Sequence, residues 1–482
     1  MKKLFLCITV VLFTVSAYAQ SNDRFYATMN IVDAEALKSD IPNQIDILAT
    51  KQNEAVVFMS PEAAHKLHDR ILVHGPGYIF KASMDDALQA LEKQGAPLNR
   101  SVLPFTITED AAVSQVLEVI QTQNIETHIL ELQEYGTRYH SMPEATQAAQ
   151  DLKTKWEAMA ALYNRDDVTV RLFTHDNTSM PSVIMTIEGA ELPDEYVIVG
   201  GHLDSTSSQG NNNAPGADDD ASGIATITEA TRALFEIGFV PKRTIEVMAY
   251  AAEEIGLVGS AEIAQEYASN GVNVIGVGQF DMTLFNGSAI DVSLISDFTN
   301  GELNNFFSQL MDHYNASGEH QITYGTSLCN YGCSDHASWT AAGYMASFPF
   351  EASFGQHNSN IHTANDTFSV SGTASHATKF TKLCAEFLIE TAKQDGVLAV
   401  DEVIVRNVFA AISQTSLVYD LTATDIIFST LEVFDVSGKK ILQQSITETK
   451  GEVSVVHLAS GVYVTKFTSA NGTSVSKKVL KK

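Results

Sequence analysis

Basic residues are scarce in this chain. It has 30 lysines and arginines against 58 aspartates and glutamates, which gives a formal net charge of −28. Proteins bind nucleic acids largely through positive charges that neutralise phosphates, so this balance argues against a nucleic-acid partner. An acidic surface is instead typical of a soluble protein with a mild preference for cationic ligands.

Long apolar runs are also missing, with one exception at the start of the chain. Lys2 and Lys3 precede an apolar stretch from Leu4 to Val15, and Ala17-Tyr18-Ala19 provides small residues for cleavage. This pattern predicts a secretory signal peptide over residues 1–19. No other run approaches the ~20 apolar residues of a membrane span, so we expect no membrane span and a mature protein outside the cytoplasm.

Cysteine is the third scarce residue, with four in the whole chain, and Cys7 belongs to the signal peptide. Cys329 and Cys333 are separated by three residues. In an exported protein this close pair predicts a tight disulfide rather than a redox or zinc motif. Cys384 lies in an amphipathic helical pattern, and we expect it to be a buried thiol.

The sequence pattern changes twice along the chain, which predicts three parts after the signal peptide. Residues 20–105 mix short apolar runs with helical segments and predict a small α+β unit. Residues 106–396 alternate strands and helices, which indicates an α/β fold with a mixed, mostly parallel sheet sandwiched by helices. Residues 401–482 read as short strands separated by turns, an all-β module that ends in a basic cluster.

Acidic and imidazole residues stand just past the ends of three apolar runs in the α/β part. They are His202 and Asp204 after Tyr196–Val199, Glu253 and Glu254 after Ile245–Ala252, and Asp281 after Val274–Phe280. Open α/β folds place their ligand sites outside the carboxyl ends of their strands, so these side chains should meet at one edge of the sheet. Histidine and carboxylate ligands without cysteine suit zinc, with cobalt or manganese as substitutes.

An acidic turn, Pro215–Gly223, lies between the first two of these clusters and leads into an amphipathic helix. Taken alone, Asp218-Asp219-Asp220 also fits an acidic helix N-terminus that satisfies the helix dipole. The adjacent Glu253 and Glu254 are harder to explain without a ligand, because two neighbouring carboxylates repel and need a counter-charge. The combination favours a metal site.

Six separated motifs resemble, in this order, those of the secreted bacterial leucyl aminopeptidases with a co-catalytic di-zinc centre. They are Gly201–Ser205, Pro215–Gly223, Ala251–Leu257, Gln279–Thr283, Cys329–Trp339 and Asn360–Thr363. The resemblance covers about residues 108–395. The N-terminal unit is similar to the family's removable propeptide, an inhibitor and folding aid that we expect to be cut off near residues 100–110.

The C-terminal module resembles a type IX secretion sorting domain through Val436–Lys440, Leu458–Tyr463 and the basic end. That resemblance implies export through the periplasm, with the type IX secretion machinery as a partner and the protein secreted or at the cell surface. A β-module that binds large substrates is the alternative. The basic end favours the sorting domain, an address read by a receptor.

The resemblance implies two Zn²⁺ per catalytic domain. Asp219 would bridge them, His202 and Asp281 would complete the ligands of one zinc, and Glu254 and His362 those of the other. Each zinc would then have three protein ligands and room for water, as catalytic sites require. Asp204 would orient the imidazole of His202, and Asp218 and Asp220 would be neighbours rather than ligands.

The same resemblance implies an exopeptidase that acts on peptides with a free N-terminus and prefers large hydrophobic first residues such as leucine. Glu253 would act as general base and then general acid, and Tyr331 would donate to the oxyanion. A solvent-facing loop aromatic is the alternative for Tyr331. An apolar pocket would hold the substrate side chain, with Met282, Ile295, Phe350, Phe354 and Ile361 as its lining. His357 stands where family members carry tyrosine.

Three rival readings share the fold. Glutaminyl cyclases use one zinc for acyl transfer, whereas the full ligand set here favours two metals and hydrolysis. Carboxypeptidase relatives insert a domain and use arginines, but only sixteen residues separate His202 from Asp219 and none is arginine. A non-catalytic surface module would have lost ligands, and none is missing. We expect an active enzyme whose catalytic domain is a monomer.

Overall fold

The computed structural model describes residues 24–68, 75–93, 105–393, 409–422, 426–435, 439–469 and 474–481. The signal peptide expected over residues 1–19 and the segment 394–408, where we expect the catalytic domain to end, lie outside these ranges. The chain divides into two compact units, Met1–Gln394 and Asp395–Lys482. Among the described residues, no helix is long and apolar enough to cross a membrane.

The first unit begins with a small α+β part, residues 24–93. Its four antiparallel strands run in the order β2-β3-β1-β4, and three helices accompany them. The elements are β1 (Phe25–Asn30), α1 (Ile31–Asp40), β2 (Ile45–Lys51), β3 (Glu54–Met59), α2 (Pro61–His68), β4 (Tyr78–Lys81) and α3 (Met84–Lys93). The sequence signal at Ser60-Pro61 is confirmed, because α2 begins at Pro61 and the Ser60 hydroxyl accepts from the Ala63 N–H.

The rest of this unit is built on a six-stranded mixed sheet in the order β12-β9-β7-β8-β6-β5. The strands are β5 (Val168–Phe173), β6 (Ser182–Ile187), β7 (Leu192–His202), β8 (Arg243–Tyr250), β9 (Asn273–Gln279) and β12 (Ala346–Ser347). The pairs between β12, β9, β7 and β8 are parallel, and β6 and β5 join antiparallel. A smaller sheet has the order β11-β10-β13, with β10 (Val292–Ile295), β11 (Tyr324–Ser327) and β13 (Pro349–Phe350).

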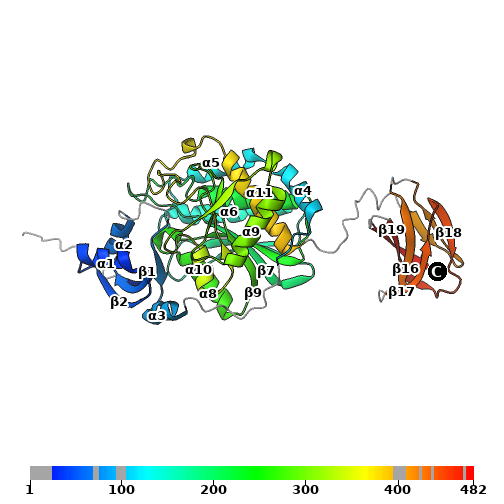
Figure 1. Cartoon of the computed structure of the whole chain (residues 1–482), viewed down its shortest axis with the longest axis horizontal. Coiled ribbons are helices and arrows are strands. Elements are labelled where there is room, and N and C mark those ends of the chain that lie inside the picture. Colours follow the sequence, from blue (N-terminus) through cyan, green and yellow to red (C-terminus); the bar gives the residue numbers. More distant parts are fainter. Residues whose placement is uncertain are drawn as a thin grey trace, which may run out of the picture. The chain divides into compact units, whose positions relative to one another are not determined.

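Side chains of the central strands alternate between two cores, as the period of a strand requires. Val197 and Val199 of β7 belong to the larger core, whereas Ile198 between them belongs to a smaller core on the other face. Both faces are therefore covered, and Figure 1 shows helices on the two sides of β7 and β9. This confirms the predicted helix-sandwiched α/β fold.

The helices form the two outer layers. They are α4 (Asp110–Val119), α5 (Thr122–Gln133), α6 (Pro143–Leu162), α7 (Ala221–Glu236), α8 (Val258–Ser269), α9 (Gly301–Tyr314), α10 (His336–Ala341) and α11 (Ser375–Ala392). Residues of α4–α7, α9 and α11 build the larger core, and residues of α8 and α10 the smaller one. Trp156 of α6 is fully buried and donates to Thr228 of α7 at 3.0 Å, which joins two of these helices.

The two expectations about cysteine are confirmed. Cys329 and Cys333 form a disulfide in the loop before α10, and Cys384 is fully buried in α11. The disulfide closes a short loop that carries Tyr331.

The second unit is all β, as predicted. One sheet has the order β14-β15-β18 and the other β17-β16-β19-β20, and their pairs are antiparallel. The strands are β14 (Phe409–Ile412), β15 (Ser416–Asp420), β16 (Phe428–Asp435), β17 (Lys440–Ser445), β18 (Lys450–Ser454), β19 (Gly461–Ser469) and β20 (Ser474–Lys481). Residues from both sheets share one apolar core of their own.

Candidate metal centre

The parallel strands bring the polar residues predicted from the sequence to one edge of the sheet. His202 is the last residue of β7 and lies opposite Tyr250, the last residue of β8. The short 3-10 helix η1 (Glu253–Ile255) follows β8 and carries both glutamates. Asp281 follows the end of β9 by two residues. Parallel strands end at the same edge, so side chains from three separate segments meet there.

Asp219 lies at the centre of the cluster, just before α7. Its Oδ1 is 2.9 Å from Nε2 of His202, which is also 3.5 Å from Oδ1 of Asp281. Its Oδ2 is 3.1 Å from Nε2 of His362, which is also 3.2 Å from Oε2 of Glu254. The two oxygens of one carboxylate thus face two separate sets of donor atoms.

The donor atoms fit a divalent metal in number, type and spacing. Zinc ligands about 2.0–2.1 Å from a tetrahedral ion lie roughly 3.3 Å apart, close to the separations found around Asp219. The donor atoms of His202, Asp219 and Glu254 all lie within 4.8 Å of one another. The carboxylates are almost completely buried, and burying so many like charges is costly without a cation.

Asp220 offers an alternative ligand, because its carboxylate also lies within 4.8 Å of donor atoms of His202 and Asp281. However, both of its oxygens already accept main-chain N–H groups. Oδ2 accepts from His202 at 3.0 Å, and Oδ1 accepts from Gly223 at 2.7 Å and from Met282 at 3.1 Å. Asp219 is therefore better placed than Asp220 to contact metal ions, and Asp220 holds three segments of the centre together.

Charges in the centre depend strongly on one another. Burial by itself lowers the pKa of His202, but Asp281, Asp204 and Asp219 together raise it well above its usual value. Burial by itself also lowers the pKa of His362, but Glu254 and Asp219 together raise it well above its usual value. The two imidazoles thus respond to an excess of negative charge, which a bound cation would neutralise.

Asp204 contacts both His202 and the η1 helix that follows β8. Nδ1 of His202 is 3.0 Å from the main-chain oxygen of Asp204 and 3.6 Å from its carboxylate. The Asp204 carboxylate also accepts the main-chain N–H groups of Glu253 at 2.9 Å and Glu254 at 3.2 Å. One residue therefore orients an imidazole and fixes the turn that carries two glutamates.

Glu253 lies beside the donor atoms without taking part in the contacts around Asp219. It is fully buried, and neither of its carboxylate oxygens has a hydrogen-bond partner among the described residues. Burial raises the pKa of Glu253 well above its usual value. Tyr331 is also buried, at 8% exposure, and burial together with Glu253 raises its pKa. The tyrosine is thus turned inward rather than toward solvent.

The five residues expected to form an apolar pocket lie together. Met282, Ile295, Phe350 and Ile361 are buried in one cluster with Tyr331, and Phe354 packs against it. The ring of His357 lies 5.6 Å from those of Phe350 and Phe354, and its Nδ1 accepts from the Gly355 N–H at 3.3 Å. The cluster also includes residues of the N-terminal part, among them Met29 and Tyr78.

Two residues that hold the ligands were missed in the sequence. The Ser334 hydroxyl donates to Oδ2 of Asp281 at 2.6 Å. The Asp366 carboxylate accepts the main-chain N–H groups of Asp218 at 3.2 Å and Asp219 at 3.1 Å. Ser334 lies within the motif Cys329–Trp339, whereas Asp366 has no sequence signal beyond its place four residues after His362.

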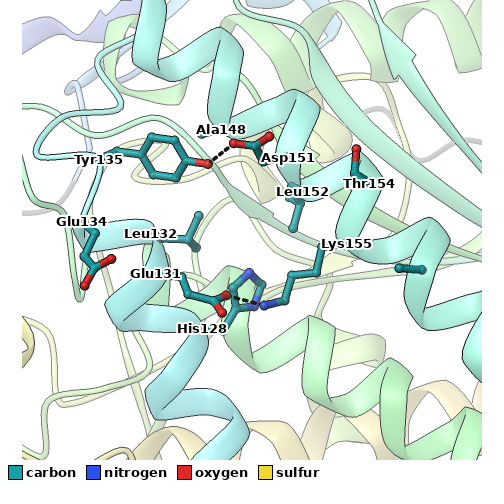
Figure 2. Close-up of a pocket in the computed structure, with 11 residues that line it drawn as sticks. His128, Glu131, Leu132, Glu134, Tyr135, Ala148, Asp151, Leu152, Thr154 and Lys155 are labelled. Carbon is teal, nitrogen blue, oxygen red and sulfur yellow. Dashed lines mark hydrogen bonds and ion pairs between the residues drawn. The ribbon is translucent and has the colours of Figure 1, made fainter.

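A second hollow, of about 590 Å³, lies between α5 and α6. Figure 2 shows it flanked by a hydrogen bond from Tyr135 to Asp151 and by the ion pair of Lys155 with Glu131, with His128 beside the latter. None of the residues expected in the metal centre or the pocket lines it.

Residues 182–388 match the sequence model of peptidase family M28, and residues 413–482 match that of a secretion system C-terminal sorting domain. A probable leucine aminopeptidase of Arthroderma benhamiae is 34% identical over 296 residues, which are 60% of this chain and 78% of that protein. A probable aminopeptidase of Saccharomyces cerevisiae is 30% identical over 295 residues, 60% of this chain and 77% of that protein.

Two solved structures from Legionella pneumophila are similar. The LapA aminopeptidase has a TM-score of 0.67 and 28% identity, and covers 77% of this chain and 99% of its own. LapB has a TM-score of 0.68 and 26% identity, and covers 77% of this chain and 100% of its own. The structural similarity therefore extends over more of this chain than the 60% matched by the fungal proteins.

The metal centre predicts that zinc stabilises the protein. After treatment with a chelator, added zinc should raise the melting temperature, because binding at 100 times the dissociation constant contributes about 2.7 kcal/mol. Differential scanning calorimetry with and without zinc measures the shift. His362→Ala should reduce it, whereas His175→Ala should not, since His175 contacts Glu262 and Ser182. Equal shifts in both variants would contradict the assignment.

Proposed function

This chain belongs to peptidase family M28, and we propose that it removes the N-terminal residue of peptides with two zinc ions and Glu253 as base. Membership of the family, together with the leucine aminopeptidase relatives, makes it a metallo-aminopeptidase. The observation that carries the proposal of two ions is Asp219, whose two carboxylate oxygens face two separate sets of ligands. In this proposal His202 and Asp281 bind one zinc, Glu254 and His362 bind the other, and Asp219 bridges them.

Zinc bound there would polarise the scissile carbonyl and lower the pKa of a water molecule. The chain's own residues perform the proton transfers. Glu253 takes a proton from the attacking water and delivers it to the departing amine. Its two buried oxygens have no hydrogen-bond partner among the described residues, so they are available for both transfers.

Tyr331 is proposed to stabilise the carbonyl oxygen as negative charge develops on it. Its pKa is raised by burial, so the phenol keeps its proton and can donate a hydrogen bond. The disulfide between Cys329 and Cys333 restrains the loop that carries it. Tyr331 is 8% exposed in the full chain, where residues of the N-terminal part share its apolar cluster.

The apolar pocket supports a preference for large hydrophobic N-terminal residues such as leucine. The fungal relatives named leucine aminopeptidases agree with this preference. Each methylene of the substrate contributes only about 1–3 kcal/mol to discrimination, so the preference should be graded rather than absolute. His357 packs edge-on to Phe350 and adds one polar ring to an otherwise apolar wall.

The N-terminal part is proposed to keep the enzyme inactive until it is cut off. Its strand β4 docks on the turn that carries Glu253, where the Phe80 N–H donates to the Gly256 carbonyl at 2.9 Å. Gly256 allows this approach, because a Cβ there would lie 2.6 Å from the ring of Tyr78. Burial raises the pKa of Tyr78, and the charges of Tyr139, Glu253 and Glu254 raise it further.

The proposed cleavage lies before Thr106, within or next to the stretch 100–110 expected from the sequence. Residues that follow are fixed to α11, since the N–H groups of Thr108 and Glu109 donate to the buried Glu390 carboxylate at 2.9 and 2.8 Å. Nζ of Lys393 donates to the Thr106 carbonyl at 2.6 Å. The mature chain would therefore keep these residues.

The C-terminal module is a secretion sorting domain, which indicates export of the protein outside the cell or to its surface. We propose that the type IX machinery reads this module after the chain has reached the periplasm. The module has a core of its own and carries none of the proposed ligands. Its role would therefore be in transport rather than in catalysis.

The first prediction of this function concerns the base. Glu253→Ala should lose activity on a leucine amide by roughly 10²–10⁴-fold, because general acid–base groups contribute that much, and should still bind two zinc ions. Metal analysis and turnover are measured on the same sample. Glu246→Gln is the matched control, a buried glutamate of β8 that bonds Tyr267 and Thr186, and it should stay active. Loss of zinc in Glu253→Ala would mean that the two glutamates have exchanged roles.

A second prediction concerns the N-terminal part. A chain beginning at Gln20 should hydrolyse leucine amides at least ~10-fold more slowly than one beginning at Phe105, because the N-terminal part covers the pocket. Contacts that contribute about 1.4 kcal/mol to this covering suffice for a tenfold effect. In the longer chain Tyr78→Ala should raise the rate, while Tyr26→Ala should not, because Tyr26 packs on Phe58 away from the pocket cluster. Equal rates for the two chain lengths would rule out inhibition.

A third prediction separates transport from substrate binding. Removing the residues after Val400 should leave turnover of short and long peptides unchanged and should trap the protein in the periplasm of the host that makes it. Cell fractionation and peptide assays measure the two effects. Normal export, or a loss of activity on long peptides alone, would favour a substrate-binding module instead.

A further inference from the structure

Arg138, in the loop between α5 and α6, is completely buried, yet it forms no ion pair with a carboxylate within the described part of the chain. Its guanidinium instead donates to four main-chain carbonyl oxygens. Nε donates to Leu203 at 2.7 Å, Nη2 to Gly216 at 2.9 Å, and Nη1 to Pro215 at 2.8 Å and to Leu132 at 3.0 Å. Four N–H groups of one planar side chain thus donate hydrogen bonds to the main chain.

Three of these carbonyls belong to the two segments that carry metal ligands. Leu203 lies between His202 and Asp204, and Pro215 and Gly216 lie four and three residues before the proposed bridging residue Asp219. The planar guanidinium therefore ties the end of β7 to the acidic turn. Lysine could not reproduce this, because an ammonium lacks the rigid fork that spaces several acceptors.

The main chain of Arg138 also helps to connect these two segments. Its N–H donates to the Ser205 hydroxyl at 3.0 Å, and that hydroxyl donates to the Ala214 carbonyl at 2.7 Å. The Ser205 N–H donates back to the Arg138 carbonyl at 3.3 Å. Arg138 and the Ser205 hydroxyl thus join the segments 203–205 and 214–216 through six hydrogen bonds.

Gly216 is shaped for this contact. Its φ is +53°, and a Cβ would lie 2.5 Å from Cβ of Ser205 and 3.0 Å from Nη2 of Arg138. A larger residue would push the guanidinium away from the turn. The positive φ of Gly216 and the close approach of Ser205 and Arg138 therefore all favour glycine at this position.

The charge of Arg138 also suits its place. Burial lowers its pKa, and the nearby carboxylates of Asp220, Asp366, Asp204 and Asp219 act against that shift. A buried cation is costly when nothing compensates it, but here it stands beside an excess of buried acids. It contributes a fixed positive charge behind the ligands without competing with a metal for their oxygens.

We propose that Arg138 is a positioning residue that fixes the separation of His202 and Asp219, so that both meet the same metal ion. The inference rests on the metal centre proposed above. Arg138 would not contact the substrate. It would affect metal affinity through the two segments that it joins.

The test is Arg138→Lys in the full chain, which keeps the charge and removes the fork. Its zinc dissociation constant, measured by competition with a chromogenic chelator, should rise about 10–100-fold, as is typical when the partners of metal ligands are lost. At saturating zinc, and after the N-terminal part has been removed by proteolysis, kcat should fall while KM stays within a few-fold, because the substrate pocket is untouched.

Arg165→Lys is the matched control. Arg165 is 9% exposed in its side chain, bonds Asp167 and donates to the Phe239 carbonyl, so it is also a largely buried arginine bound to backbone. Both variants should lower the melting temperature of the metal-free protein, but only Arg138→Lys should weaken zinc binding. An unchanged zinc dissociation constant in Arg138→Lys would show a merely structural role and would overturn the proposal.

Ser205→Ala provides a second, milder variant in case Arg138→Lys does not fold. It removes the hydroxyl that bridges Arg138 and Ala214, and should weaken zinc binding in the same direction by a smaller factor. Wild-type protein that binds zinc without peptidase activity would reject the proposed function, while the inference would still be decided by the two dissociation constants. Wild-type protein that binds no zinc would overturn the inference as well.

Discussion

The structure depends on one electrostatic constraint, the excess of buried negative charge at the carboxyl edge of a parallel sheet. Asp219, Glu253, Glu254 and Asp281 are each at most 2% exposed, and two histidines and one arginine stand among them. Carboxylates buried this deeply repel one another unless cations or hydrogen bonds compensate them. Both kinds of compensation occur around this centre, and they act on different acids.

Acids around the centre fall into two groups according to what their oxygens contact. Asp204, Asp220 and Asp366 accept main-chain N–H groups and thereby hold neighbouring segments in place. Asp219 is different, since its two carboxylate oxygens lie 2.9 Å and 3.1 Å from the imidazoles of His202 and His362. The first group thus binds main-chain donors, whereas Asp219 faces two side chains that are metal ligands in the proposed centre. This division explains why Asp220, although next to Asp219 in the sequence, is a poorer ligand.

The sequence could predict those parts of the site that follow from strand ends and from recognisable motifs. The apolar runs before His202 and Asp281 located strands, and strands that run parallel must end together, so the clustering followed. Arg138 and Asp366 could not be found this way, because each acts on the backbone of segments distant in sequence. Such contacts leave no periodic or compositional trace. The α/β fold and the β-module were predictable because their periodicities differ.

The pocket and the sheet are packed separately, and this has a consequence for activation. Met282, Ile295 and Phe350 belong to a cluster that they share with the N-terminal part, including Tyr78, whereas the central strands belong to two other cores. In the proposed activation, removing the N-terminal part would uncover the pocket, and would also release the contacts of Ile79 and Phe80 near the turn that carries Glu253 and Glu254. The central strands have two cores of their own, formed with helices α4–α11. The sheet whose strand ends carry the proposed ligands would therefore stay packed on both faces after such a cleavage.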